Sequence, residues 1–180
     1  PANATGLIDP VPLYAMGRFN HEAACVDPRT GFVYLTEDRD NGVLYRFKPN
    51  VPGKLAEGGQ LQAMQVMGIP DVRNWSGRHI KEGAPIAVRW LDLDDVESPK
   101  DDLRFRAVSR GATLVARGEG IHMGENEAFV CSTSGGRAGL GQIFKLSLST
   151  SGDQDRLELV FESVSHHQFN FGDNLTVAPN

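Results

Sequence analysis

Apolar and polar residues alternate in short segments along most of the chain, and glycine and proline separate these segments. The clearest pair is residues 23–26 and 32–36, which flank the turn DPRTG at residues 27–31. Proline favours a type I turn, and the final glycine accepts the left-handed backbone that closes a hairpin. The pattern therefore predicts antiparallel strands. Further strands are expected at residues 43–47, 61–67, 86–91, 129–133, 142–148, 157–164 and 175–178.

One stretch has the features of a helix, beginning after Ser98 and Pro99. Serine is a good N-cap, proline is tolerated at the first helical position, and the acids Asp101 and Asp102 suit the first turn. Apolar residues follow at helical spacings, although Gly111 weakens the middle. We expect a helical insertion near residues 98–116.

The chain resembles itself when it is shifted by 97 residues. Glu22 then falls on Glu119, and after a slip of two residues the segment 44–47 falls on 143–146. A third copy begins at Asp173 and is cut short by the last residue. Each unit therefore has the order strand, tight turn, strand, loop, strand, longer loop, strand.

Four-stranded antiparallel units repeated around an axis form a β-propeller. We expect an all-β fold in one domain over residues 1–180, with about two blades and the start of a third that is truncated at residue 180. Two blades cannot close on themselves, so we expect a segment of a larger protein that self-associates through its open edges when alone. A small two-sheet sandwich is the alternative fold.

Composition narrows the function classes. Eighteen basic against 23 acidic residues give a net charge of −5 without any basic block, which argues against nucleic-acid binding. No apolar run approaches the roughly 20 residues that span a bilayer. The two cysteines, Cys25 and Cys131, are too few for a disulfide framework, and we expect both to fill core positions.

An acidic residue stands immediately before the first predicted strand of each repeat unit: Glu22, Glu119 and Asp173. Because the innermost strands of a propeller line its axis, acids at one equivalent position should converge. Clustered carboxylates repel one another unless a cation compensates them, and hard cations such as calcium prefer oxygen ligands. The three acids therefore predict a metal site, with solvated acids at strand ends as the alternative.

Several longer motifs resemble the PhoX-type bacterial alkaline phosphatases in the order of that family. They are GRFNHEAA (17–24), VDPRTG (26–31), VYLTED (33–38), ARGEG (116–120), STSGG (132–136), AGLG (138–141) and DNLTV (173–177). The resemblance implies an exported phosphomonoesterase, periplasmic or extracellular, that acts on small phosphate esters and holds calcium and iron in the channel of a propeller.

Carried over residue by residue, the resemblance makes Glu22 and Glu119 metal ligands and Arg117 the arginine that holds the substrate phosphate. Asp173 falls in a block that precedes further acidic ligands, expected beyond Asn180, and an iron-binding cysteine is expected upstream of Pro1. Because part of the ligand set would lie outside it, we expect the 180-residue chain alone to be inactive.

Two other function classes stay open. A calcium-dependent propeller hydrolase of the lactonase type would also place acids around an axial cation, although Arg117 beside Glu119 favours phosphate. A noncatalytic propeller or an inert enzyme fragment is the other class. The glycine-rich segment 135–141 could cradle a phosphate, but its place between two predicted strands favours a hairpin loop.

Overall fold

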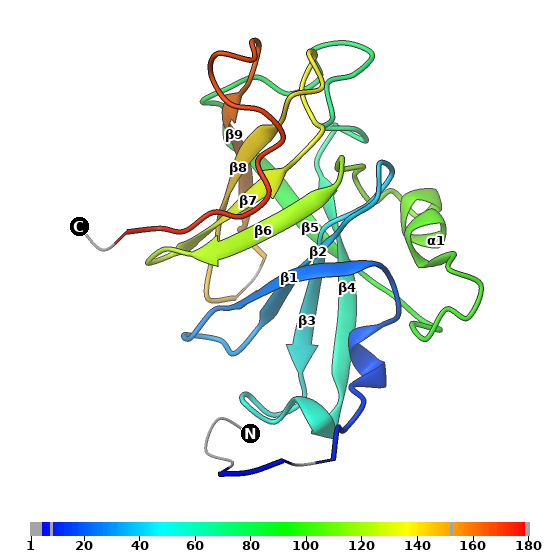
Figure 1. Ribbon diagram of the computed structural model, residues 1–180. Helices are drawn as coiled ribbons and strands as arrows, with labels where there is room; N and C mark the ends of the chain where they lie inside the picture. Colours follow the sequence, from blue (N-terminus) through cyan, green and yellow to red (C-terminus); the bar gives the residue numbers. More distant parts are fainter. Residues whose placement is uncertain (1–4, 8, 152, 179–180) are drawn as a thin grey trace.

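The computed structural model describes residues 5–7, 9–151 and 153–178 (Figure 1). One antiparallel sheet of nine strands dominates the fold, so the all-β prediction is confirmed. The strands are β1 (His21–Val26), β2 (Val33–Glu37), β3 (Tyr45–Pro49), β4 (Gly59–Val66), β5 (Ile86–Asp92), β6 (Gly118–Met123), β7 (Glu127–Ser132), β8 (Gln142–Ser147) and β9 (Arg156–Glu162). The α-helix α1 (Leu103–Ser109) and the 3-10 turns η1 (Tyr14–Met16) and η2 (Leu55–Glu57) complete the elements.

The strand order is β1-β2-β3-β4-β5-β9-β8-β7-β6. Two antiparallel units, β1 to β4 and β6 to β9, are thus joined through β5, which pairs with both β4 and β9. The two ends of the sheet, β1 and β6, pack against each other, so the sheet nearly closes on itself (Figure 1). This arrangement brings residues from the two sequence repeats into contact.

Eight of the nine predicted strands lie within two residues of observed ones at each end, one predicted strand is not observed, and one observed strand, β6, was not among those predicted. Residues 175–178 are described by the structure and form no strand. The segment nevertheless lies beside β6, where the amide of Val177 donates a hydrogen bond to Nδ1 of His122 (3.3 Å). Local alternation did not predict β6, because GEGIHM combines two glycines with weak alternation, and only the repeat implied a strand after Glu119.

The helix is much shorter than the predicted insertion. Ser98 and Asp101 have positive φ angles of 36° and 55°, so the chain cannot be helical there. The Ser98 hydroxyl accepts from the amide of Asp102, which stabilises a turn before the helix begins. Gly111, at φ 101°, lies beyond its end. The serine is therefore a turn residue, and only seven residues are helical.

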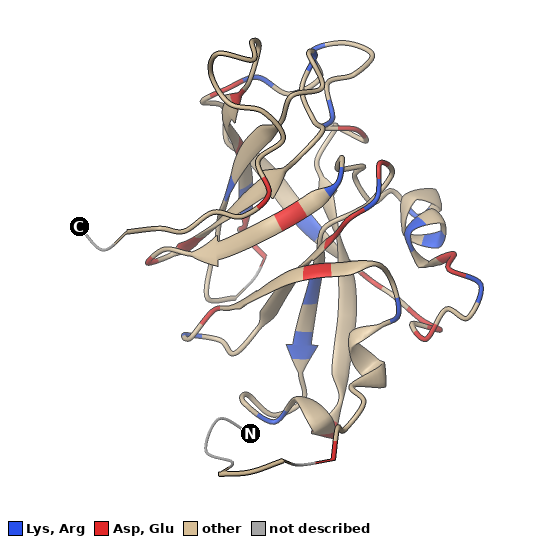
Figure 2. Cartoon of the chain, in the orientation of Figure 1, with Lys and Arg blue, Asp and Glu red and all other residues tan. Residues whose placement is uncertain are grey.

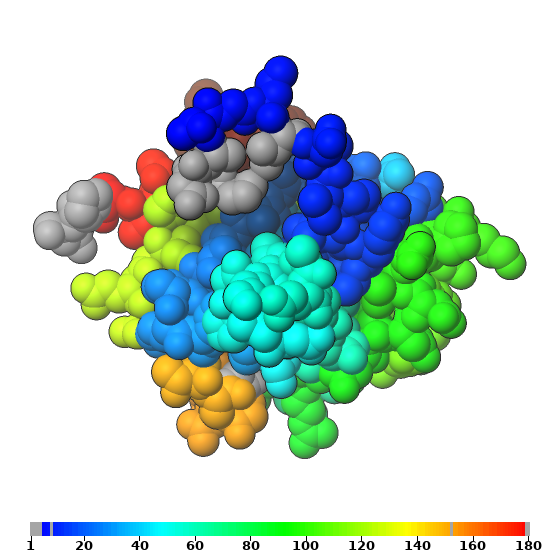
Figure 3. All heavy atoms as spheres, turned by 90° about the horizontal axis from the view of Figure 1, so that it is seen from below, coloured from blue at the N-terminus to red at the C-terminus, as the bar shows by residue number. Residues whose placement is uncertain are grey.

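Alternate residues of β2 fill two cores. Tyr34 packs with the core that both units share, whereas Val33 and Leu35 pack in a second core against β3, β4 and α1. Figure 3, viewed from below, shows the region of α1 and the C-terminal segment on opposite sides of the molecule. Among the described residues, no helix has the length and apolar character to cross a membrane.

Candidate metal and phosphate site

The first hairpin of each unit contains the same irregularity. In β1 the pairing with β2 shifts between His21 and Ala24, and in β6 the pairing with β7 shifts between Gly118 and Ile121. Such a bulge bends the strand and re-aims the side chains within it. Glu22 and Glu119 are the second residues of these strands, so both lie inside the bulge and not before the strand as the sequence suggested.

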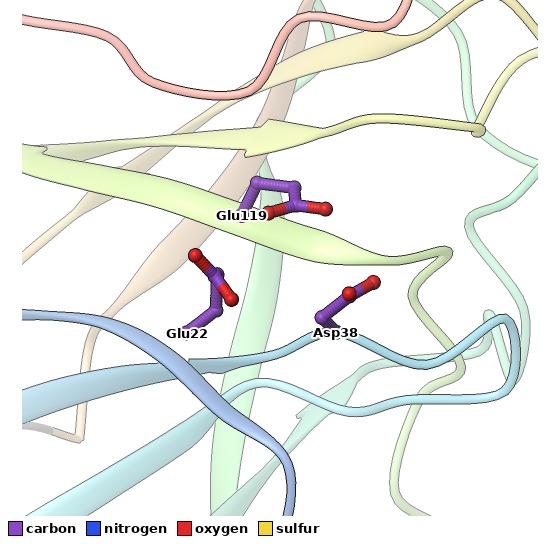
Figure 4. Close-up of side chains that lie close together, drawn as sticks. All are labelled: Glu22, Asp38 and Glu119. Carbon is purple, nitrogen blue, oxygen red and sulfur yellow. The ribbon is translucent and has the colours of Figure 1, made fainter.

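Three carboxylates converge where β1, β6 and the end of β2 meet (Figure 4). Glu22 comes from β1, Glu119 from β6 and Asp38 from the residue after β2, and one oxygen of each lies within 4.8 Å of the others. In Figure 2, acidic residues colour both β1 and β6 where these strands face each other. The fold thus brings two of the predicted site residues together and adds a third acid.

Arg117 links two of these carboxylates. Its Nε donates to Oδ1 of Asp38 (2.7 Å), and its Nη2 donates to Oε1 of Glu119 (2.8 Å). Its backbone has a φ of 44°, a left-handed conformation that costs a non-glycine residue of the order of 1 kcal/mol or more. Backbone hydrogen bonds from the Arg117 amide to Arg39 O and from Thr133 N to Arg117 O hold this conformation.

The backbone of Asp38 makes a reciprocal pair of hydrogen bonds with Asn20. Its amide donates to the carbonyl of Asn20 (3.0 Å), and the Asn20 side-chain amide donates to the carbonyl of Asp38 (2.8 Å). Thr36 donates to the carbonyl of Glu119 (2.6 Å), which fixes β2 against β6. Asp38 and Glu119 are therefore held through their backbones, independently of the ion pairs that their side chains make.

The electrostatics of the cluster favour a cation. Burial raises the pKa of Glu119 to about 7, and the charges of Asp38, Glu22 and Asp173 act in the same direction against the opposing effect of Arg117. Only 5% of Glu119 is exposed, whereas Glu22 is exposed. A carboxylate in this position is costly to ionise without a nearby positive charge.

Asp173 lies beside the cluster without joining it. Its carbonyl accepts from the amide of Gly120 (2.8 Å), which ties the C-terminal segment to β6, and its charge acts on Glu119. Among the described residues, the group within 4.8 Å contains Glu22, Asp38 and Glu119 and not Asp173. Metal binding by Asp173 therefore stays a prediction.

The sequence repeat did not identify Asp38 as a site residue. The shift of 97 residues places Asp38 on Gly135, so the second unit has no matching acid. Asp38 was visible only as the last residue of the VYLTED motif, directly after a strand and at the edge where β6 arrives in the fold.

The glycine-rich segment 135–141 connects β7 and β8 as a hairpin loop, as predicted. Its Arg137 amide donates to Oε1 of Glu162 (3.2 Å), and Asn74 and Gln142 donate to Oε2 of the same carboxylate. The loop thus binds a carboxylate of its own chain. Cys131 is buried and Cys25 half-buried, and burial raises the pKa of each thiol to about 12, which leaves both protonated.

The family model described as alkaline phosphatase PhoX matches residues 1–180. The chain belongs to the PhoX family. No curated protein and no solved structure matches it. The match spans both repeat units and includes Glu22, Asp38, Arg117 and Glu119. The family is one of phosphatases, which gives the acidic cluster and its arginine a chemical context.

The cluster of this PhoX family chain has the donor set of a hard-cation site. All three side chains offer carboxylate oxygens, which calcium accepts at about 2.3–2.6 Å. Glu119 is buried with a raised pKa, so a cation would replace the partial compensation that Arg117 now gives. The residues therefore fit calcium, and further oxygen ligands would complete its usual shell of six to eight.

Proposed function

We propose that this chain supplies part of the active site of a phosphomonoesterase that hydrolyses small phosphate esters. The observation that carries the proposal is the convergence of Glu22, Asp38 and Glu119, of which Asp38 and Glu119 form ion pairs with Arg117. A hard-cation site next to a guanidinium provides both charge neutralisation and bidentate binding for a phosphate. Family membership supports the reaction class.

In this proposal Glu22, Asp38 and Glu119 hold calcium, and Asp173 adds a ligand from the C-terminal segment. Iron is proposed on the family resemblance, with its cysteine ligand outside this chain. Bound cations supply Lewis-acid stabilisation of the phosphoryl oxygens and lower the pKa of a bound water. The backbone of β1, β2 and β6 fixes the positions of the acids, because each lies in or directly after a strand.

Arg117 binds the phosphate of the substrate in this proposal. Its side chain is 39% exposed, so it can reach a ligand while it keeps its contact to Asp38. Once the carboxylates are neutralised, the Nη groups are free to donate to phosphate oxygens as a planar fork. A lactone offers no such anion before reaction, so the placement of Arg117 favours phosphatase over lactonase chemistry.

We further propose that β1 to β4 and β6 to β9 are two blades of a propeller whose third blade begins near Asp173. The matching bulges in β1 and β6, the innermost strands of such blades, support this division. Export to the periplasm or medium rests on the family resemblance. If the propeller is incomplete, the 180-residue chain alone should be inactive and should self-associate. Turnover assays and sedimentation test these two expectations.

The test uses the complete protein, purified and analysed for bound metals. We expect calcium in the preparation and hydrolysis of p-nitrophenyl phosphate that a chelator removes and added calcium restores. Hydrolysis of a lactone but not of the phosphate ester would support the lactonase alternative. If the protein binds neither metal nor phosphate, the noncatalytic scaffold is the alternative that remains.

A further inference from the structure

Two clefts meet beside the proposed phosphate-binding arginine. The first, of about 420 Å³, is lined by Asn20, Asp38, Arg39, Asp40, Asn41, Arg104 and Arg117. The second, of about 190 Å³, shares Asn20 and Arg39 and continues to Arg18 and Asp101. The two clefts therefore adjoin at Asn20 and Arg39, and together they are called the groove.

The backbone places Arg39 next to Arg117. The carbonyl of Arg39 accepts from the amide of Arg117 (2.8 Å) and also from the amide of Gly42 (2.9 Å). The two arginines thus come from segments far apart in the sequence, yet their main chains are in direct contact. These hydrogen bonds fix the main chain of Arg39, and its long side chain can extend from this position along the groove.

The other guanidiniums of the groove are already engaged. Arg104 is 8% exposed and donates to Asp101 (3.0 Å), and Arg18 donates to the carbonyl of Ser98 (2.9 Å). Arg39 instead makes a long ion pair of 3.7 Å with Asp101, and its side chain is 46% exposed. Exposed pairs of this kind contribute about 0–1 kcal/mol, so a ligand can displace it easily.

We propose that Arg39 is a specificity residue that binds a second anionic group in the leaving part of the substrate. This inference rests on the proposed phosphatase function. The favoured substrates are then phosphate monoesters with a further phosphate, such as sugar bisphosphates. With the reacting phosphate at Arg117, the groove directs the rest of the molecule past Arg39, whose fork suits phosphate oxygens.

The first test compares glucose 6-phosphate with glucose 1,6-bisphosphate in the complete, metal-loaded protein. We expect Arg39→Gln to lower kcat/KM for the bisphosphate about ten-fold, mainly through KM, because one charged hydrogen-bonding partner is lost. The value for glucose 6-phosphate should change less than about two-fold. Arg78→Gln, at an exposed arginine in a separate cleft, is the matched control.

The second test measures binding without turnover, by calorimetry with propylphosphonate and propane-1,3-bisphosphonate. Wild type should prefer the bisphosphonate, and Arg39→Gln should remove that preference while Arg39→Lys keeps part of it. If wild type hydrolyses neither ester yet shows this Arg39-dependent preference, the phosphatase proposal fails, and with it the substrate class, while Arg39 is still assigned as the residue that binds a second anionic group. Equal effects of Arg39→Gln on mono- and bis-anionic ligands, or no preference in wild type, would overturn the inference.

Discussion

Glu22 and Glu119 occupy the same position of the same bulge in two hairpins that lie 97 residues apart in the chain. Each is the second residue of its strand, and in each the pairing register shifts across the following residues. Because β1 and β6 pack against each other, the two bulges aim their carboxylates into one space (Figure 4). Repetition of a local backbone irregularity thus builds a site between the units.

The first prediction is that Glu22→Gln and Glu119→Gln each abolish tight calcium binding in the complete protein. An amide keeps the shape and one neutral oxygen but removes the negative charge that a hard cation requires. Calorimetry with calcium measures the loss. Glu125→Gln, at an exposed acid in the turn between β6 and β7, is the control and should bind calcium as wild type does. Unchanged affinity in either cluster variant would exclude the cluster as the calcium site.

The second prediction concerns the acid that sequence repetition did not reveal. Asp38→Asn should weaken calcium binding as strongly as Glu119→Gln, since the three oxygens lie within 4.8 Å of one another. It should also release Arg117, whose Nε now donates to Asp38 at 2.7 Å. A variant with normal calcium content but weakened phosphate binding would assign Asp38 to positioning Arg117 alone.

Local patterns were sufficient to predict most strands but not how the strands assemble. Residues 27–31 specified the first hairpin through Pro28 and Gly31, and the turn is observed between β1 and β2. Local alternation did not predict β6, which contains two glycines, because the strand forms through its pairing with β7 and not through its own side-chain pattern. The helix prediction was too long because Ser98 and Asp101 have positive φ angles and the Ser98 hydroxyl accepts from the amide of Asp102, which makes a turn before the helix.

Two of the three carboxylates in the cluster could be identified from the repeat, and the third depends on the closure of the sheet. Glu22 and Glu119 are linked by the shift, whereas Asp38 enters only because β2 lies beside β6, where Thr36 donates to the Glu119 carbonyl. The pairing of Arg117 with Asp38 spans 79 residues and has no counterpart in the other unit. Contacts of this kind follow from tertiary packing and leave no periodic signal.

The third prediction tests whether Arg117 acts on the phosphate. Arg117→Lys in the complete protein should weaken inhibition by inorganic phosphate about ten-fold while the calcium content stays unchanged, because lysine keeps the charge but loses the planar fork. Metal analysis and phosphate inhibition of p-nitrophenyl phosphate hydrolysis give the two readouts. Loss of metal with unchanged phosphate affinity would make Arg117 a structural partner of the acids.

The last prediction concerns the pH dependence of the free energy of unfolding, to which the carboxyl group of Glu37 should make a large contribution. This residue is 1% exposed; its Oε2 accepts from the hydroxyl of Tyr45 (3.1 Å) and from the amide of Val43 (3.3 Å), and Oε1 lies 3.6 Å from Nη1 of Arg104. Burial nevertheless raises the pKa of Glu37 from 4.5 to about 7.

Between these two pH values the folded protein retains a proton that the unfolded chain has lost, so the free energy of unfolding falls as pH rises. The contribution of Glu37 is complete below pH 4.5 and is lost as pH rises through about 7. Glu37→Gln should therefore remove about 2–3 kcal/mol of the decrease between about pH 5 and 8. Urea unfolding of the metal-free protein across this range measures it, with Glu125→Gln as the exposed control. Parallel profiles for wild type and Glu37→Gln would mean that Glu37 is ionised throughout, with Arg104 compensating its charge fully.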